Sequence, residues 1–452
     1  MDQGVLEKES LLLIFTFAPA GLGHLRVTDA LHDGLPVHKP SHLLGSEDRA
    51  VEVFHRLTSI HPLARNIFES FQRGIAAKQF TFWYRKYLRS RTKVLKRKLF
   101  EIIEKEPGIK EMVVVSTHFG LAHQIAAIKK EIEKEMGVKV YLFVQVTDDS
   151  PQEIWYVYGA DIIFVPSEKT KEELINYGKA EGYPEVRFEV TPYPISPVFS
   201  QSLSQEESEV RLAQTLPDEN APINVSIPVG GAAVSMDYYL ALMEELHKLS
   251  PRFVFHVVSR EKPFTTKFLA EMQNKDYIKV YASKDSREVI KFYEELFKRE
   301  VFSLEVTKPS EQTFKALLSS QERGGVLLLF SLPVGVQEYD NLNFLERHFL
   351  VPGKALNTNL WLMAEEGKKL NEKDDFELLK EACTWRGIRL PKDAGKAAQF
   401  VFWCLKERIF SQMVLCTGEP QPNDTSPEEL GEGGIRKFWE IVSDYISQDS
   451  SK

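Results

Sequence analysis

The feature that most constrains this chain is an alternation of short apolar runs with helical patterns, which occurs twice along its 452 residues. The first series of apolar runs comprises residues 11–18, 111–116, 138–147, 160–166 and 187–191. The second series comprises residues 223–228, 253–259, 278–282, 302–306 and 326–330. Runs of this length are typical of strands buried on both faces, and strands that alternate with helices form parallel sheets. The pattern predicts an α/β protein with two doubly wound, Rossmann-like domains.

Composition places the domain boundaries and excludes some classes of function. We expect a first domain over 1–200, a polar linker over 201–221, a second domain over 222–400, and helices with an acidic connector over 401–452. The net charge of −8 argues against general nucleic-acid binding. The first apolar run is too short to span a bilayer, so we expect no transmembrane segment.

A small-residue loop, Pro19 to His24, separates the first apolar run from a helical pattern that begins near Leu25. The loop lacks the Lys-Ser/Thr of a Walker A motif and the third glycine of a dinucleotide fingerprint. A histidine at a helix start suits a general base, because its unperturbed pKa is near neutrality and the positive helix end favours the neutral ring. The alternative interpretation of His24 is a structural residue that hydrogen-bonds the loop.

Two further polar side chains stand directly after predicted strands. His118 follows the run 111–116, and Asp148 follows the run 138–147. Ligands of doubly wound sheets bind beyond the carboxyl ends of the strands. We therefore expect His24, His118 and Asp148 to belong to one site.

Residues 80–100 form a basic and aromatic stretch. Eight Lys/Arg lie between Arg85 and Lys98, and no acid occurs from Gly74 to Phe100. Basic residues among aromatics and leucines favour an interfacial helix on an anionic membrane. The predicted membrane contacts are Trp83, Arg85, Lys86, Arg89, Lys96 and Arg97. The alternative is a solvated basic helix whose leucines pack inward.

Ordered motifs over about residues 10–350 resemble the glycosyltransferases of the GT-B fold, in which two such domains face each other across a cleft. The branch is that of monogalactosyldiacylglycerol synthase, bacterial diacylglycerol glucosyltransferases and the peptidoglycan N-acetylglucosamine transferase. The segments that carry the resemblance are Gly21-x-Gly23-His24, Ser116-Thr117-His118-Phe119, Val146-Thr147-Asp148, Trp155, Gly159-Ala160-Asp161, Phe164-Val165-Pro166-Ser167, Pro194 to Phe199, Gly230-Gly231, Lys308-Pro309 with Thr313, and Gln337-Glu338-x-x-Asn341.

The resemblance implies a sugar transfer from a nucleotide-sugar, a UDP-sugar, to a lipid or membrane-associated acceptor, as in glycolipid biosynthesis. The first domain would bind the acceptor, with His24 as base, Asp148 holding or polarising His24 or the acceptor, and Gly21, Gly23, His118 and Thr147 beside them. The second would bind the donor through Gly230, Gly231, Lys308, Pro309, Thr313, Gln337, Glu338 and Asn341. No bound metal or other cofactor is implied. The protein would be cytoplasmic and peripherally associated with the membrane.

The donor half departs from the family pattern. Ser310-Glu311 replaces two glycines after Lys308-Pro309, and Ala316 stands where the family has an acidic residue. A glutamate near a diphosphate is unfavourable at short range. Two alternatives therefore stay open. One is a GT-B-like binding or scaffold protein with reduced catalysis, and the other is a nucleotide-sugar 2-epimerase, which would need no membrane.

Overall fold

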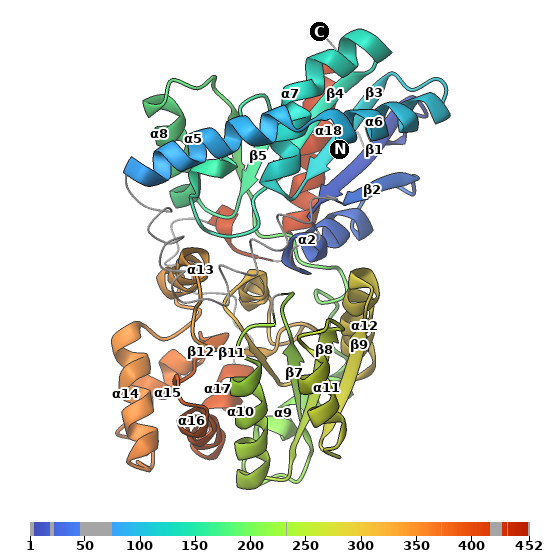
Figure 1. The fold of residues 1–452 in the computed structure, drawn as a ribbon. Helices are drawn as coiled ribbons and strands as arrows, with labels where there is room; N and C mark the ends of the chain where they lie inside the picture. Colours follow the sequence, from blue (N-terminus) through green and yellow to red (C-terminus); the bar gives the residue numbers. More distant parts are fainter. Residues whose placement is uncertain are drawn as a thin grey trace. The chain divides into compact units, whose positions relative to one another are not determined.

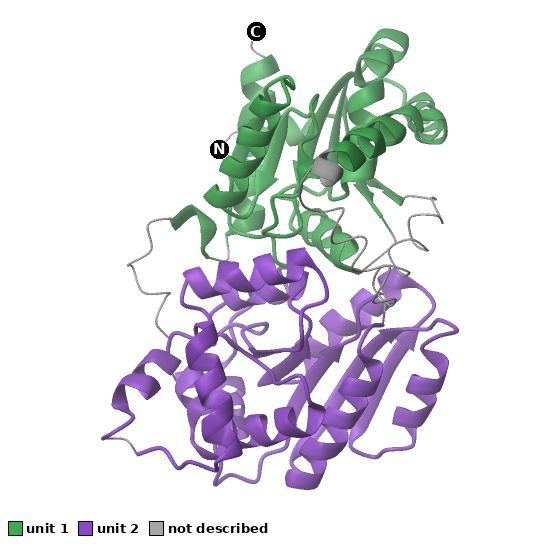
Figure 2. Cartoon of the chain, turned by 60° about the vertical axis from the view of Figure 1, so that its left-hand side comes forward, with its two compact units in different colours: residues 1–196, 426–452 green, residues 197–425 purple. Residues whose placement is uncertain are grey.

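The computed structural model describes residues 4–18, 22–45, 75–231, 233–371, 373–415, 427–431 and 433–450. Gly21 lies outside these residues. The described chain forms two compact units, which Figure 2 distinguishes by colour. Unit 1 comprises residues 1–196 and 426–452, and unit 2 comprises residues 197–425.

Each unit is built on one parallel six-stranded sheet (Figure 1). In unit 1 the strand order is β2-β1-β3-β4-β5-β6. The bounds are β1 Leu11–Phe17, β2 Ser41–Gly45, β3 Glu111–Ser116, β4 Lys139–Gln145, β5 Ile162–Val165 and β6 Arg187–Val190. In unit 2 the order is β12-β11-β10-β7-β8-β9. The bounds are β7 Ile223–Pro228, β8 Phe253–Arg260, β9 Ile278–Ser283, β10 Leu304–Thr307, β11 Leu327–Phe330 and β12 Gly387–Arg389. These strand orders confirm two doubly wound Rossmann-like domains, the pair from which the GT-B fold is made.

Helices alternate with the strands in both units. In unit 1 they are α1 Gly4–Glu7, α2 Leu22–Asp33, α5 Ile75–Ser90, α6 Lys93–Lys105, α7 Phe119–Met136, η1 Glu153–Trp155, α8 Glu168–Ala180, η3 Pro427–Glu429 and α18 Gly434–Ser450. In unit 2 they are α9 Gln205–Thr215, α10 Met236–Leu249, α11 Thr266–Gln273, α12 Ser286–Arg299, η2 Glu311–Leu317, α13 Val336–Arg347, α14 Lys354–Glu365, α15 Phe376–Ala382, α16 Ala394–Lys406 and α17 Ile409–Leu415.

Burial on both faces explains why the strands read as apolar runs. In β1, Leu12 and Ile14 join the core that includes Ile125 and Ile128 of α7. Phe15 points to the other face, where its ring lies 6.0 Å from that of Trp439 in α18. Consecutive strand residues point to opposite faces, so a strand covered on both sides needs apolar residues at every position.

Two edge strands, β2 and β12, were not predicted. β2 reads Ser-His-Leu-Leu-Gly and is half-buried along its whole length. β12 has only three residues and includes Gly387. Each strand pairs on one side only and needs few apolar residues, so its sequence lacks the signal of the central strands.

The domain boundaries differ from the predicted ones at two places. The segment expected as a linker contains α9, and Arg211 of this helix is buried in unit 2. The Arg211 guanidinium donates to the backbone carbonyls of Phe302, Ser320 and Glu322 at 2.7–2.8 Å. The expected C-terminal segment 401–452 is divided, because α16 and α17 belong to unit 2 whereas α18 belongs to unit 1.

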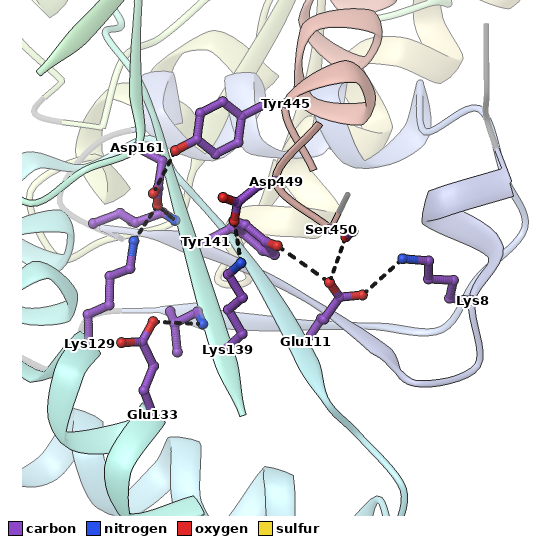
Figure 3. Close-up of polar contacts among 12 residues, drawn as sticks. Lys8, Glu111, Lys129, Glu133, Lys139, Tyr141, Asp161, Tyr445, Asp449 and Ser450 are labelled. Atoms are coloured by element: carbon purple, nitrogen blue, oxygen red, sulfur yellow. Dashed lines mark hydrogen bonds and ion pairs between the residues drawn. The ribbon is translucent and has the colours of Figure 1, made fainter. Parts of the chain in front are cut away.

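The last helix, α18, is attached to the first sheet by polar contacts (Figure 3). Tyr445 donates to Asp161 at 3.2 Å, and Ser450 donates to Glu111 at 3.2 Å. Lys139 of β4 forms an ion pair with Asp449, and this contact raises the pKa of Lys139 to about 12. The end of the described chain is therefore part of the first domain.

Candidate functional site

The predicted acceptor-side residues of unit 1 meet at the carboxyl ends of β1, β3 and β4. His24 lies in the first turn of α2, which follows β1. Its Nδ1 atom is 2.7 Å from the backbone carbonyl oxygen of Thr117, and 3.3 Å from the hydroxyl of Thr147. Thr117 follows β3 and Thr147 follows β4, so three neighbouring strand ends position one imidazole.

The carbonyl contact selects a tautomer of His24. A carbonyl oxygen only accepts hydrogen bonds, so Nδ1 of the neutral ring carries the proton and Nε2 carries the lone pair. The carbonyl of His24 is itself held by two hydroxyls, from Thr28 at 2.8 Å and Thr117 at 3.0 Å. Thr28 is one helical turn after His24, a spacing that would have identified it from the sequence.

Aromatic rings surround His24. The ring of His118 lies 5.3 Å from that of His24 in an edge-on arrangement, and the ring of Trp155 lies 6.3 Å away. Phe119 packs against both, with its centroid 4.6 Å from His118 and 5.5 Å from Trp155. His118 is buried. Its position beside His24 agrees with the expected common site, and its packing is that of a wall residue.

The Thr117 carbonyl lies at Nδ1 of His24, and the expected role of Asp148 in holding or polarising His24 or the acceptor stays a prediction. Asp148 is half-buried, and any contact with a substrate stays a prediction. Its neighbour Asp149 is buried and accepts hydrogen bonds from Ser167 and Thr170 at the start of α8. Asp149 therefore holds the start of α8 to the loop after β4.

In unit 2, Gly230 and Gly231 follow β7 at the carboxyl edge of the sheet. Gly230 is exposed, and an added Cβ would meet open space. Further along the loop, Ala233 and Ser235 have φ angles of +48° and +66°. This left-handed conformation costs a non-glycine residue about 1–2 kcal/mol. The loop turns sharply before α10 without glycine at these two positions.

The other predicted donor residues connect two neighbouring strand ends. Lys308 follows β10, and its Nζ atom lies 2.6 Å from Oε1 of Glu338 in the first turn of α13. Asn341, one turn later, donates to the carbonyl of Pro309 at 3.1 Å. The side chain of Gln337 folds over Gly335, where an added Cβ would lie 2.8 Å from it. The sequence predicted that these residues belong to one candidate site. It did not predict that Lys308 pairs with Glu338 or that Asn341 bonds to Pro309.

Thr313 lies in η2 and is fully buried. Its hydroxyl has no hydrogen-bond partner among the described residues. Next in this helix, Lys315 is buried with Glu305 and Tyr293, and its ammonium group lies 4.9 Å from the centre of the Phe297 ring. Thr313 therefore belongs to a packed support beneath the Lys308 loop, and direct contact with a donor stays a prediction.

The basic stretch is divided between the interior and the surface. Arg85 is buried and donates to the hydroxyls of Tyr177 and Tyr183 and to the carbonyl of Glu153. It cannot contact a membrane, so that prediction is wrong. Arg89 stacks on Tyr158 with its guanidinium 4.0 Å from the ring centre, and burial lowers its pKa.

The Lys96 ammonium group pairs with Glu131 at 2.7 Å and Glu135 at 3.1 Å on α7, and its contact with a membrane stays a prediction. Trp83, Lys86 and Arg97 remain on the surface. The Trp83 side chain is 63% exposed, and the Lys86 ammonium group lies 5.3 Å from its ring centre. One of the expected cations, Lys86, thus lies beside an exposed aromatic group.

No helix among the described residues has the length and apolarity that crossing a membrane requires. In the same part of the chain, no three His, Cys, Asp or Glu side chains gather as metal ligands would. The metal-free reaction expected from the family resemblance stays a prediction.

Comparisons with known proteins yield matches of structure alone. No protein-family model matches the chain. No curated protein matches its sequence.

Three solved structures illustrate the structural matches. The S. aureus MnaA–UDP co-structure shares 10% identity with a TM-score of 0.48, over 96% of each chain. UDP-GlcNAc 2-epimerase from Neisseria meningitidis, bound to UDP-GlcNAc, shares 9% identity with a TM-score of 0.47, over 96% of this chain and 99% of that one. A UDP-glucosyltransferase from Polygonum tinctorium shares 12% identity with a TM-score of 0.45, over 96% and 98%. At these values we base the fold class on the strand orders and draw no function from the matches.

Proposed function

We propose that the chain is a glycosyltransferase that moves a sugar from a UDP-sugar to a hydroxyl of a lipid or membrane-associated acceptor. The observation that carries this proposal is the 2.7 Å contact of His24 Nδ1 with the Thr117 carbonyl. The Nδ1–H of His24 points at the Thr117 carbonyl, and Nε2 is therefore the basic atom. A neutral imidazole with a defined basic nitrogen can accept the acceptor's proton as the new glycosidic bond forms.

The proposed step forms one bond, breaks one bond and transfers one proton. The acceptor oxygen attacks the anomeric carbon of the donor sugar, and the bond between that carbon and the diphosphate oxygen breaks. His24 takes the hydroxyl proton, and UDP leaves as the anion. The rings of Trp155, Phe119 and His118 pack together beside His24, and water that such rings keep away from the reacting atoms would favour transfer over hydrolysis.

A lipid acceptor is supported by the surface of α5. The side chains of Phe80, Phe82, Trp83 and Tyr87 are 39–63% exposed on this helix. Lys86 and Arg91 lie over the rings of Trp83 and Tyr87. Exposed aromatic rings with adjacent cations suit the interface of an anionic bilayer.

A direct test is a screen of nucleotide-sugars with a lipid extract, in which released nucleoside diphosphate is measured. Transfer requires release of UDP that depends on the extract and is lost in His24→Ala. The matched control is His38→Ala, because His38 is an exposed histidine that precedes β2, at the opposite edge of the sheet. Wild-type turnover by folded His24→Ala would exclude His24 as the base.

The same assay separates the two alternatives. A 2-epimerase would convert the sugar nucleotide without any lipid. A scaffold protein would release no UDP and bind none at millimolar concentration. The scaffold alternative has one observation in its favour, which is that the Lys308 ammonium group is already neutralised by Glu338.

A further inference from the structure

The ammonium group of Lys308 and the first turn of α13 meet at one position in unit 2. β11, β10 and β7 are neighbours in the sheet, so Lys308 after β10, α13 after β11 and Gly230 after β7 share its carboxyl edge. A lysine and a helix N-terminus at such an edge are the groups that an anion would use.

Glu338 already pairs with the lysine and with a backbone N–H that lies just before the N-cap of α13. Its Oε1 atom is 2.6 Å from Lys308 Nζ, and its Oε2 atom accepts the Val334 N–H at 2.7 Å. The Glu338 side chain is 7% exposed and that of Lys308 is 19% exposed. The carboxylate thus approaches the lysine from the protein interior, and the lysine keeps a side toward solvent.

We propose that Glu338 is a built-in counter-ion that competes with the donor diphosphate for Lys308. This inference rests on the proposed function, and it concerns how the site admits a nucleoside diphosphate. An incoming diphosphate brings negative charge toward a carboxylate that cannot move to water without leaving its own hydrogen bond at Val334.

The alternative role for this ion pair is structural, namely to hold α13 against the loop after β10. Asn341 already makes such a contact, because it donates to the Pro309 carbonyl at 3.1 Å. Glu338→Gln keeps an oxygen for the Val334 N–H and turns its amide NH2 toward Lys308, so it removes the charge and the ion pair at nearly constant shape, and we expect it to fold.

The test is calorimetric titration of UDP, and separately of inorganic pyrophosphate, into wild type and Glu338→Gln at one ionic strength. We expect Glu338→Gln to bind both ligands roughly tenfold more tightly, since it removes one close negative charge. Lys308→Met should abolish the gain when combined with Glu338→Gln. The matched control is Glu346→Gln, which removes an ion pair of the same helix, with Arg389 at 2.6 Å, and should leave the affinity unchanged.

The outcomes separate this inference from the proposed function. If wild type binds UDP and Glu338→Gln binds it equally or more weakly, the proposal that Glu338 is a counter-ion is overturned. The proposal of a glycosyltransferase is unaffected by that result. Binding by Glu338→Gln alone supports the counter-ion and argues for reduced catalysis in the natural chain. No binding by either protein at millimolar UDP overturns both. An equal gain in UDP affinity in Glu346→Gln would show a non-specific effect of charge. That result also overturns the proposal that Glu338 is a counter-ion.

Discussion

The Nζ atom of Lys315 lies 2.7 Å from Oε2 of Glu305, and both side chains are buried in unit 2. Tyr293 donates to the same carboxylate oxygen at 2.6 Å and also contacts Lys315. The ion pair joins β10, which carries Glu305, to η2, which carries Lys315, and these two elements flank Lys308. A buried ion pair contributes little net stability, but removing one partner leaves an uncompensated charge.

Lys315→Met should therefore destabilise unit 2 by about 3 kcal/mol, because Glu305 would remain charged in the interior. Urea unfolding followed by tryptophan fluorescence measures this loss. Adding Glu305→Gln should restore much of the stability, since the second change removes the unpaired charge. A loss below about 1 kcal/mol in Lys315→Met would mean that the interior tolerates the lone carboxylate.

Thr147→Val should lower kcat by about fivefold, which corresponds to one neutral hydrogen bond of about 1 kcal/mol. The Thr147 hydroxyl is the weaker of the two contacts at His24 Nδ1, and the Thr117 carbonyl would still fix the tautomer. KM for the donor should not change, because Thr147 belongs to unit 1. Steady-state kinetics in both substrates provide the measurement, and a KM effect without a kcat effect would argue against a role in orienting His24.

Trp83→Ala with Lys86→Ala should weaken binding to anionic vesicles by roughly fivefold, since one lysine near a charged surface contributes about 1 kcal/mol. Co-sedimentation with phosphatidylglycerol vesicles measures this. Lys169→Ala, an exposed lysine of α8, is the control and should bind as wild type does. Equal binding by the double variant would place the membrane contact elsewhere.

Arg85→Ala should instead lower stability, because Arg85 holds α5 to Tyr177 and Tyr183.

The first domain should lose stability in mild acid. Burial lowers the pKa of His123 to about 3, helped by repulsion from Arg85, and the ring is hydrogen-bonded to the Ile154 carbonyl at 2.9 Å. The unfolded chain binds the proton near pH 6.5 and the folded chain does not, so stability falls as the pH drops below 6.5. At pH 5 the contribution is about 2 kcal/mol.

His123→Gln should reduce this pH dependence, because a glutamine can donate to the same carbonyl and does not titrate in this range. Urea unfolding at pH 7 and pH 5 compares the two proteins. If the variant loses as much stability as wild type over this range, His123 is not the titrating group.

Much of the candidate site followed from the sequence because its residues sit beside strand ends. The apolar runs at 111–116 and 223–228 coincide with β3 and β7. Once those strands are parallel, His24, Thr147 and His118 have to lie at one edge. The bond from His24 to the Thr117 carbonyl was not predictable in this way, because a backbone carbonyl carries no sequence signal.

The sequence by itself determined the two sheets, since strands covered on both faces require unbroken apolar runs that no other arrangement needs. The tertiary structure alone decided which charged side chains are buried and which partners they pair with. Arg85 is buried because two tyrosines 92 and 98 residues away close around it. Lys308 meets Glu338, and α18 returns to the first sheet, because distant segments are brought together. Periodicity reports which face of an element is apolar, whereas the partner of a charged group depends on where the rest of the chain folds.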